Sequence, residues 1–128
     1  MVKNKMTILI VEDNATFRKL IRQALSDAAS SFVECSDGAG AVEAYATHRP
    51  DLVLMDIRMP RLDGLTATRL LKKQFPEARV LMLTDYDDDD LRTAAKEAGA
   101  CGYALKQNLT LLESIVEQIQ KCQNQPLP

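Results

Sequence analysis

The sequence predicts an α/β fold in which helices cover both faces of a parallel sheet. Five short apolar runs alternate along the chain with segments of helical periodicity. Two of these runs, residues 8–11 and 52–55, are apolar without interruption, which is typical of strands buried on both faces. The 128 residues fit one domain with a full core, folded without a disulfide framework or a structural metal. We therefore expect five β–α units arranged in three layers, a doubly wound (βα)5 sandwich.

The five apolar runs are interpreted as the strands, because each is short and none contains a proline. They are Met6–Val11, Phe32–Cys35, Leu52–Met55, Val80–Leu83 and Cys101–Leu105. Parallel strands need a crossover between them, and each segment between two runs is long enough for a helix. The expected element order is βαβαβαβαβα.

The segments after the strands have the spacing of amphipathic helices. Pro50 and Pro76 mark the ends of the second and third helices, and Gly99 is the expected C-terminal cap of the fourth. The apolar faces of the first and last helices carry Phe17, Leu20, Ile21, Ala24, Leu25 and Ala28, and Leu112, Ile115, Val116 and Ile119, respectively.

The fourth helix has a thin apolar stripe made of Leu91, Ala94, Ala95 and Ala98. Small side chains bury little area, so this helix is either lightly anchored and able to shift or packed close against the sheet. The acidic run Asp87–Asp90 before it matches no calcium loop, and we interpret it as the start of the helix, where acidic residues favour the helix dipole.

Charge and composition exclude several classes of function. Sixteen Lys and Arg residues against eighteen Asp and Glu give a formal charge of −2, without the basic excess that binds nucleic acid or an anionic membrane. The single histidine, His48, excludes a zinc site built from several histidines and leaves Ser-His or Cys-His chemistry one candidate base. We expect no direct binding to nucleic acid or membrane.

The three cysteines, Cys35, Cys101 and Cys122, are scattered and form no C-x-x-C motif. Cys35 and Cys101 lie in apolar runs and are expected to be buried free thiols, which fits a reducing compartment. The first apolar run has six residues, too short for a signal peptide or a membrane span. The sequence therefore predicts a cytoplasmic protein.

Polar residues directly follow four of the five strands. Glu12 and Asp13 follow the first strand, Asp56 the third, Thr84 the fourth and Lys106 the fifth. Ligands of open parallel sheets bind at the carboxyl ends of the strands, and in the order 2-1-3-4-5 the first and third strands are neighbours at the point of reversal. We expect three carboxylates, a hydroxyl and an ammonium group at one edge of the sheet.

This combination of groups points to phosphoryl chemistry with a divalent cation. Crowded carboxylates repel one another unless a cation lies between them, and oxygen ligands without imidazole select Mg²⁺, with Mn²⁺ as the alternative, over zinc. Asp56 is the candidate nucleophile that forms an aspartyl phosphate, with Lys106 and Thr84 in contact with phosphoryl oxygens. Taken singly, Asp13 could cap a helix and Lys106 could be solvated; their joint placement favours a site.

These residues lie in motifs that resemble those of bacterial response-regulator receiver domains, the CheY-like family. The motifs are IVEDN at residues 10–14, DLVLMDIRMP at 51–60, Asp63-Gly64, Leu83-Thr84 and GACGYALK at 99–106. The resemblance spans residues 7–122 and implies a flavodoxin-like fold. It implies a receiver domain over residues 1–122 and a tail or truncated linker over residues 123–128.

The resemblance also implies a role for each site residue. Asp56 is the expected phosphoacceptor, with a sensor histidine kinase as the donor of the phosphoryl group. Asp13, Asp56 and the main-chain carbonyl of Arg58 are expected to hold Mg²⁺, and Glu12 to reach it through water. Lys106 and Thr84 match the phosphate-contacting lysine and hydroxyl.

Tyr103 matches the family's switch aromatic, expected to turn inward when Thr84 moves toward the phosphoryl group. Switching is expected to change the face formed by the fourth helix, fifth strand and fifth helix. Its expected partners are an output domain or effector protein, or a second receiver as a homodimer.

Four departures from the usual family pattern distinguish this chain. Gln107 replaces a proline, and since a cis non-proline bond costs about 2.5–4 kcal/mol, we expect a trans bond there. The missing proline makes the stretch similar to receivers of LuxR/NarL-type regulators, which carry a C-terminal DNA-binding domain; any such domain is expected to lie outside residues 1–128. Asp85 adds a negative charge where a small residue is usual. Arg58 and Tyr86 are expected to crowd the path of the hydrolytic water and lengthen the life of the phosphoryl group.

Three other classes of protein share part of this pattern. A haloacid dehalogenase-like, Mg²⁺-dependent phosphohydrolase needs a second aspartate two residues after Asp56, where this chain has Arg58. A flavin phosphate would be repelled by Glu12 and Asp13, which argues against a flavodoxin-like carrier. A pseudo-receiver that binds partners without being phosphorylated remains open. Beyond self-phosphorylation and autodephosphorylation at Asp56, we expect no enzymatic activity.

Overall fold

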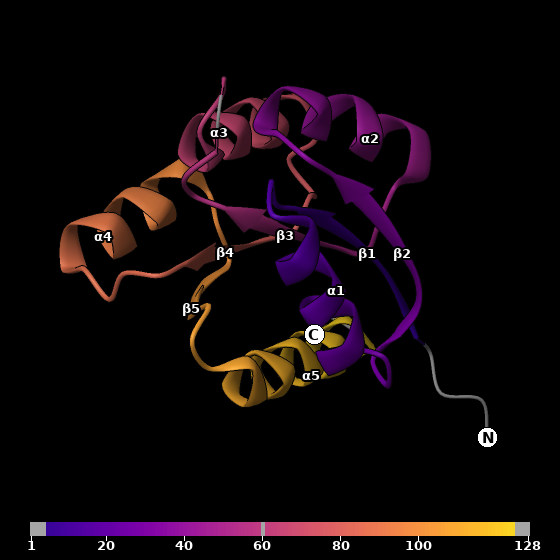
Figure 1. The fold of residues 1–128 in the computed structure, drawn as a ribbon. Helices are drawn as coiled ribbons and strands as arrows, with labels where there is room; N and C mark the ends of the chain where they lie inside the picture. The colour runs from indigo at the N-terminus through magenta and orange to yellow at the C-terminus, as the bar shows by residue number, and fades with distance from the viewer. Residues whose placement is uncertain (1–4, 60, 125–128) are drawn as a thin grey trace.

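Five parallel strands form one sheet in the order β2-β1-β3-β4-β5 in the computed structural model, which describes residues 5–59 and 61–124 (Figure 1). This is the order that the sequence predicts. The strands are β1 (Met6–Val11), β2 (Ala29–Cys35), β3 (Leu52–Asp56), β4 (Val80–Thr84) and β5 (Gly102–Leu105).

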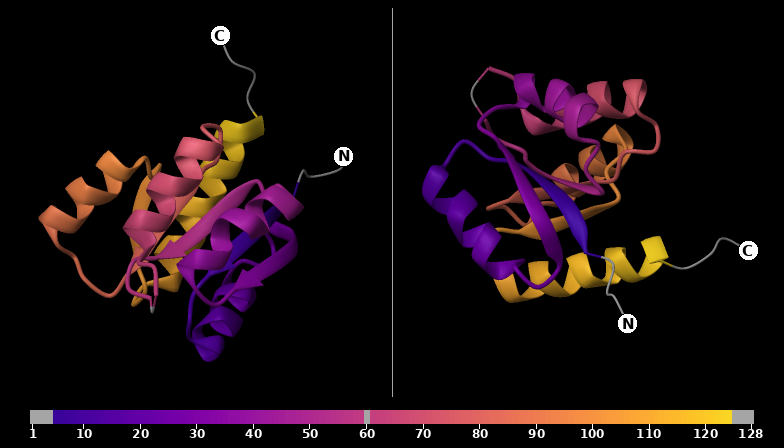
Figure 2. Two further views of the ribbon diagram at one scale, coloured as in Figure 1. Left: turned by 90° about the horizontal axis from the view of Figure 1, so that it is seen from above. Right: turned by 90° about the vertical axis from the view of Figure 1, so that its right-hand side faces the viewer.

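Helices cover both faces of this sheet, so the molecule has the three predicted layers (Figures 1 and 2). On one face lie α1 (Ala15–Ala24) and α5 (Leu109–Asn124); on the other lie α2 (Ala41–His48), α3 (Gly64–Gln74) and α4 (Asp89–Ala98). A short 3-10 helix, Gly38–Gly40, precedes α2. The chain therefore follows the doubly wound, flavodoxin-like path.

Alternate residues of the central strands enter two separate cores. In β1, Ile8 and Ile10 pack toward Ile21 of α1, whereas Leu9 and Val11 pack on the opposite side of the sheet. All five residues of β3 and of β4 are buried. This explains the uninterrupted apolar runs, because each side chain of a central strand faces one of the two helical layers.

The edge strands depart from the predicted boundaries. β2 begins at Ala29, three residues before the predicted start, because Ser30 and Ser31 are exposed at the edge of the sheet and carry no apolar signal. β5 begins one residue later than predicted, at Gly102. Hydrophobic patterning thus locates the central strands better than the edges.

The burial predicted for two cysteines is wrong. Cys35 is half-buried at the end of edge strand β2, where its thiol donates to the main-chain oxygen of Asp37 at 3.0 Å. Cys101 is exposed just before edge strand β5. Both are free thiols, as predicted, but their positions at the sheet edges leave them in reach of solvent.

Each predicted helix-stopping residue has its expected place. α2 ends two residues before Pro50 and α3 ends two residues before Pro76. Gly99 caps α4 with φ of 103°, a left-handed conformation that glycine adopts without strain. α5 extends two residues beyond the predicted domain boundary at 122, and the remainder of the predicted tail, residues 125–128, lies outside the described residues.

The acidic run before α4 begins the helix, as predicted. The Asp88 carboxylate accepts from the backbone N–H groups of Asp90 at 2.8 Å and Leu91 at 3.2 Å. The stripe of α4 buries Ala95 and Ala98 and leaves Leu91 half-buried. The side chains that hold this helix are therefore small.

Over the described part of the chain, no helix combines the length and apolar character needed to cross a membrane.

Gly64 positions α3 directly against the end of β3. Its N–H donates to the carbonyl of Ile57 at 2.8 Å, and a Cβ at this residue would lie 2.0 Å from the carbonyl oxygen of Asp56. We expect Gly64→Ala to destabilise the fold by about 2 kcal/mol, as overpacking does, measured by urea unfolding. Glycine-to-alanine changes inside helices ordinarily stabilise, so a gain in stability would contradict this packing.

Candidate functional site

The predicted site residues meet in an open pocket of about 220 Å³ at the carboxyl ends of the strands. Glu12 and Asp13 directly follow β1, Asp56 ends β3, Thr84 ends β4 and Lys106 directly follows β5. The pocket is lined by Glu12, Asp13, Asn14, Asp56, Arg58, Thr84, Asp85, Tyr86 and Lys106. Residues far apart in the sequence are thereby gathered at the edge where the strand order reverses.

Strand register brings the carboxylates together. β1 and β3 are parallel neighbours, with Val11 opposite Met55, so the residues that follow each strand leave the sheet side by side. Glu12 is 1% exposed and Asp56 is 3% exposed. Asp13 is exposed at the mouth of the pocket. Two of the three carboxylates are thus withdrawn from water.

Lys106 contacts both buried carboxylates. Its Nζ lies 2.5 Å from Glu12 Oε1 and 3.1 Å from Asp56 Oδ2. The same Nζ lies 5.1 Å from the centre of the Phe17 ring on α1, within the range of a cation–π contact. The lysine is therefore a fixed part of the site and not a solvated surface group.

Burial shifts the pKa values of the two carboxyl groups that Lys106 contacts. Burial raises the pKa of Glu12 to about 7. A hydrogen bond with Asp13 and the charge of Asp56 also raise this pKa, whereas the contact with Lys106 lowers it. Burial also raises the pKa of Asp56, although Lys106 opposes the shift. Burial lowers the pKa of Lys106, but the two carboxylates more than reverse this and raise it above its usual value.

The acidic cluster has the donor set of a divalent cation site. One carboxylate oxygen from each of Glu12, Asp13 and Asp56 lies within 4.8 Å of the others. All are hard oxygen donors, which Mg²⁺ and Mn²⁺ prefer. The main chain of Arg58 adjoins the cluster, because its N–H donates to Asp56 Oδ1 at 3.3 Å. The residues present therefore fit such an ion, and they could hold one in this pocket.

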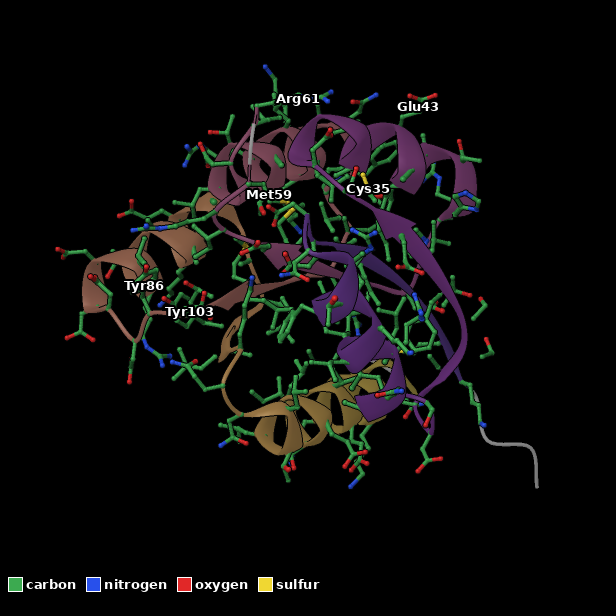
Figure 3. All side chains as sticks on the ribbon, viewed as in Figure 1. Cys35, Glu43, Met59, Arg61, Tyr86 and Tyr103 are labelled. Carbon is green, nitrogen blue, oxygen red and sulfur yellow. The ribbon has the colours of Figure 1, made fainter. Side chains whose placement is uncertain are left out.

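The hydroxyl groups of Thr84 and Tyr103 both contact the segment that leads into α4. Thr84 is buried, and its Oγ1 accepts from the N–H of Tyr86 at 3.2 Å. Tyr103 is half-buried on β5 and donates its hydroxyl to the main-chain oxygen of Tyr86 at 2.6 Å, and both tyrosines lie beside the start of α4 (Figure 3). Tyr103 does not line the pocket itself; it reaches the pocket through Tyr86.

A family model for the response regulator receiver domain matches residues 8–119 of this chain. The chain belongs to this receiver domain family. The match begins within β1, covers β2 to β5 and most of α5, and includes each residue that lines the pocket. Receiver domains are signalling modules of two-component systems, and this assignment agrees with the fold and the pocket.

Similar proteins include one of comparable length and one about twice as long. The chain is 40% identical over 100 residues to the chemotaxis protein CheY of Bacillus subtilis, covering 77% of this chain and 83% of CheY. It is 36% identical over 107 residues to the transcriptional regulatory protein DegU of Brevibacillus brevis, covering 82% of this chain and 45% of DegU. This receiver domain thus spans about half the length of DegU.

Solved structures agree with the fold. The signal receiver domain of the putative response regulator NarL from Mycobacterium tuberculosis superimposes with a TM-score of 0.83 at 31% identity, covering 92% of this chain and 98% of that one. A two-component response regulator of the LuxR family from Aurantimonas has a TM-score of 0.86 at 29% identity, with 93% and 87% covered. The predicted similarity to LuxR/NarL-type receivers is confirmed.

In this receiver domain, two side chains at the pocket rim form a stack that the sequence did not reveal. The guanidinium carbon of Arg58 lies 4.5 Å from the centre of the Tyr86 ring. The stack joins the β3–α3 loop to the β4–α4 loop, and both residues line the pocket. The sequence identified both residues as bulky groups near Asp56, but their contact depends on the three-dimensional separation of two loops.

Gln107 ties the loop after β5 to the loop after β4. Its side-chain Nε2 donates to the main-chain oxygen of Asp85 at 2.8 Å. The described residues contain no cis peptide bond, so the predicted trans bond at Gln107 is confirmed.

The one histidine, His48, ends α2 shortly before β3 begins. It therefore lies toward the amino ends of the strands, whereas the pocket lies at their carboxyl ends.

Proposed function

We propose that this receiver domain accepts a phosphoryl group on Asp56 from a phosphohistidine of a sensor histidine kinase. The observation that carries the proposal is the position of the Asp56 carboxylate. It lies in the pocket, 3.1 Å from the ammonium of Lys106 and within 4.8 Å of the Glu12 and Asp13 carboxylates. A nucleophile, a cationic partner for a phosphoryl oxygen and the ligands of a divalent cation are thus next to one another.

The transfer breaks one bond and forms one bond. A carboxylate oxygen of Asp56 attacks phosphorus, the bond from phosphorus to the kinase imidazole breaks, and the released imidazole takes up a proton. Lys106 then turns its charge from the carboxylates to a phosphoryl oxygen, and the Thr84 hydroxyl donates to another. Both groups stabilise charge on the phosphoryl group as it passes to Asp56.

The ligands of the cation would be Asp13, Asp56 and the main-chain carbonyl of Arg58, with Glu12 acting through water. When bound, Mg²⁺ supplies positive charge against the phosphoryl oxygens. Glu12 and Asp56 share the single ammonium of Lys106, and an Asp13 oxygen lies within 4.8 Å of them. This crowding supports that part of the proposal, because a cation would relieve the repulsion between the carboxylates.

The signal is proposed to leave through Tyr103 and the α4-β5-α5 face. Movement of Thr84 toward the phosphoryl group would disturb its contact with Tyr86, whose main-chain oxygen holds the Tyr103 hydroxyl. The small buried side chains of α4 would let that helix respond. The partner would be an output domain or effector, or a second receiver; the likeness to DegU and to LuxR-family regulators supports a DNA-binding output domain.

The test is incubation with acetyl phosphate and Mg²⁺, followed by intact-mass measurement. We expect one phosphoryl group on the wild type, none after removal of Mg²⁺ with EDTA, and none on Asp56→Asn. A folded wild type that takes up no phosphoryl group would contradict the proposal and favour a pseudo-receiver that only binds partners. Sustained release of phosphate in large excess over protein would instead indicate a phosphohydrolase.

A further inference from the structure

Arg18 of α1 joins the acidic pair to the end of β2. Its Nη1 donates to the main-chain oxygen of Glu12 at 2.5 Å, and its Nε pairs with Glu34 Oε1 at 2.8 Å. The Arg18 side chain is 17% exposed and the Glu34 side chain 34% exposed, so the guanidinium is mostly buried and its carboxylate partner lies at the surface. One guanidinium thus contacts the backbone of the site and a carboxylate of the neighbouring strand.

The peptide group after Glu12 is the one that Arg18 holds. Glu12 N–H donates to the main-chain oxygen of Cys35 at 3.0 Å, and Glu12 Oε2 accepts from the N–H of Asn14 at 3.0 Å. Arg18 adds the contact at the Glu12 carbonyl. Since a peptide group is planar, fixing this carbonyl also fixes the direction in which the chain continues into Asp13.

Asp13 has the greatest need of such support. Glu12 and Asp56 are held by burial and by Lys106, whereas Asp13 is exposed at the pocket mouth. Its carboxylate can meet the other two only if the backbone before it keeps one orientation. The contacts at Glu12 fix that orientation from β2, which lies on the far side of β1 from the phosphoacceptor strand.

We propose that Arg18, held by Glu34, is a positioning residue that orients the Glu12–Asp13 peptide for cation binding. This inference rests on the proposed function, because it assigns Arg18 a role in the same Mg²⁺ site. Arg18 does not touch the cation or the phosphoryl group; it acts through the main chain. Residues that orient metal ligands typically contribute tenfold or more to affinity, so the contribution is measurable.

The neighbouring arginine offers a matched control. Arg22, one turn further along α1, pairs with the other oxygen of the same carboxylate, Glu34 Oε2. Arg18 and Arg22 therefore share helix, charge and partner, and they differ in the contact with Glu12. A general effect of positive charge on α1 would affect both variants similarly, whereas a positioning effect belongs to Arg18.

The experiment compares Mg²⁺ affinity among Arg18→Gln, Arg18→Lys, Glu34→Gln and Arg22→Gln. Affinity is read from the backbone amide NMR shifts of Asp13 and Asp56 during Mg²⁺ titration, and again from half-saturation of phosphorylation by acetyl phosphate. We expect Arg18→Gln to bind Mg²⁺ about tenfold more weakly and Glu34→Gln about threefold more weakly. Arg22→Gln should remain close to the wild type, and the rate at saturating Mg²⁺ should change little in all four.

Arg18→Lys separates charge from geometry. Arg18 reaches the Glu12 carbonyl and Glu34 from two nitrogens, Nη1 and Nε, whereas lysine keeps the positive charge but carries all its donors on one nitrogen. The affinity of Arg18→Lys should therefore stay near that of Arg18→Gln. Full recovery with lysine, or an equal loss in Arg22→Gln, would overturn the inference in favour of simple charge. Unchanged affinity in Arg18→Gln would also overturn it.

Failure of the proposed function is distinguishable from failure of this inference. A wild type whose Asp13 and Asp56 amides do not respond to Mg²⁺ would overturn both. A responsive wild type with an equally responsive Arg18→Gln variant would overturn the positioning role alone. If Arg18→Gln does not fold, the Mg²⁺ affinities of Glu34→Gln and Arg22→Gln are compared instead. Equal affinities in these two variants would contradict the positioning role of Arg18, and a loss confined to Glu34→Gln would support it.

Discussion

Replacing Lys106 with methionine is expected to destabilise the protein by about 3 kcal/mol in the absence of Mg²⁺. Lys106 contacts Glu12 and Asp56, both nearly inaccessible to water, and its own side chain is only 14% exposed. Removing one partner of a buried ion pair leaves charge without compensation, which costs more than the pair itself contributes. The free energy of unfolding by urea, followed by far-UV circular dichroism, measures the loss.

Mg²⁺ should restore much of this stability. A divalent cation held by the acidic cluster supplies the charge that methionine removes, and a ligand that binds the folded state raises its stability. Lys19→Met provides the control, since Lys19 is an exposed residue in the middle of α1 and its loss should change the stability little. A Lys106→Met variant as stable as Lys19→Met without Mg²⁺ would contradict the ion pairs described here.

The central part of the fold could be predicted because burial leaves a direct mark on the sequence. Both faces of β3 and β4 are covered, so their residues are apolar without interruption. Sheet order then places the residues after β1 and β3 together, and the carboxylate pocket follows from chain positions alone. Asp56 and Asp13 could be found this way because their meeting depends on the backbone and not on side-chain conformation.

The edge strands and the supporting contacts could not be predicted, because exposed strand residues and side-chain contacts leave no such mark on the sequence. Ser30 and Ser31 of β2 face solvent, and the exposed Cys101 lies in a segment that reads as apolar. The contact of Arg18 with Glu12 joins a helix side chain to a main-chain oxygen, and nothing in residue type or spacing indicates it. Such contacts depend on side-chain directions, which are set only when the helices pack.

Trimming both Arg58 and Tyr86 to alanine is expected to speed autodephosphorylation about thirtyfold, a change of about 2 kcal/mol in the activation free energy. Hydrolysis requires a water that attacks phosphorus while the bond to the Asp56 oxygen breaks, which releases phosphate and regenerates the carboxylate. Arg58 and Tyr86 stack on each other and both line the pocket that holds Asp56, so we expect them to crowd the path of this water. Loss of the phosphoryl group from the purified phosphoprotein, followed by intact mass, gives the rate.

The single variants indicate whether the stack acts as a unit. Tyr86 is 47% exposed, so the contact with Arg58 is worth only about 0.5–1 kcal/mol, and either side chain alone can leave the other free to move aside. We therefore expect each single change to give only part of the effect. Arg49→Ala removes a stack of the same length on Phe75, near the start of β3 and away from the pocket, and should leave the rate unchanged. A double variant no faster than Arg49→Ala would show that water reaches the phosphoryl group by a path that these two side chains do not obstruct.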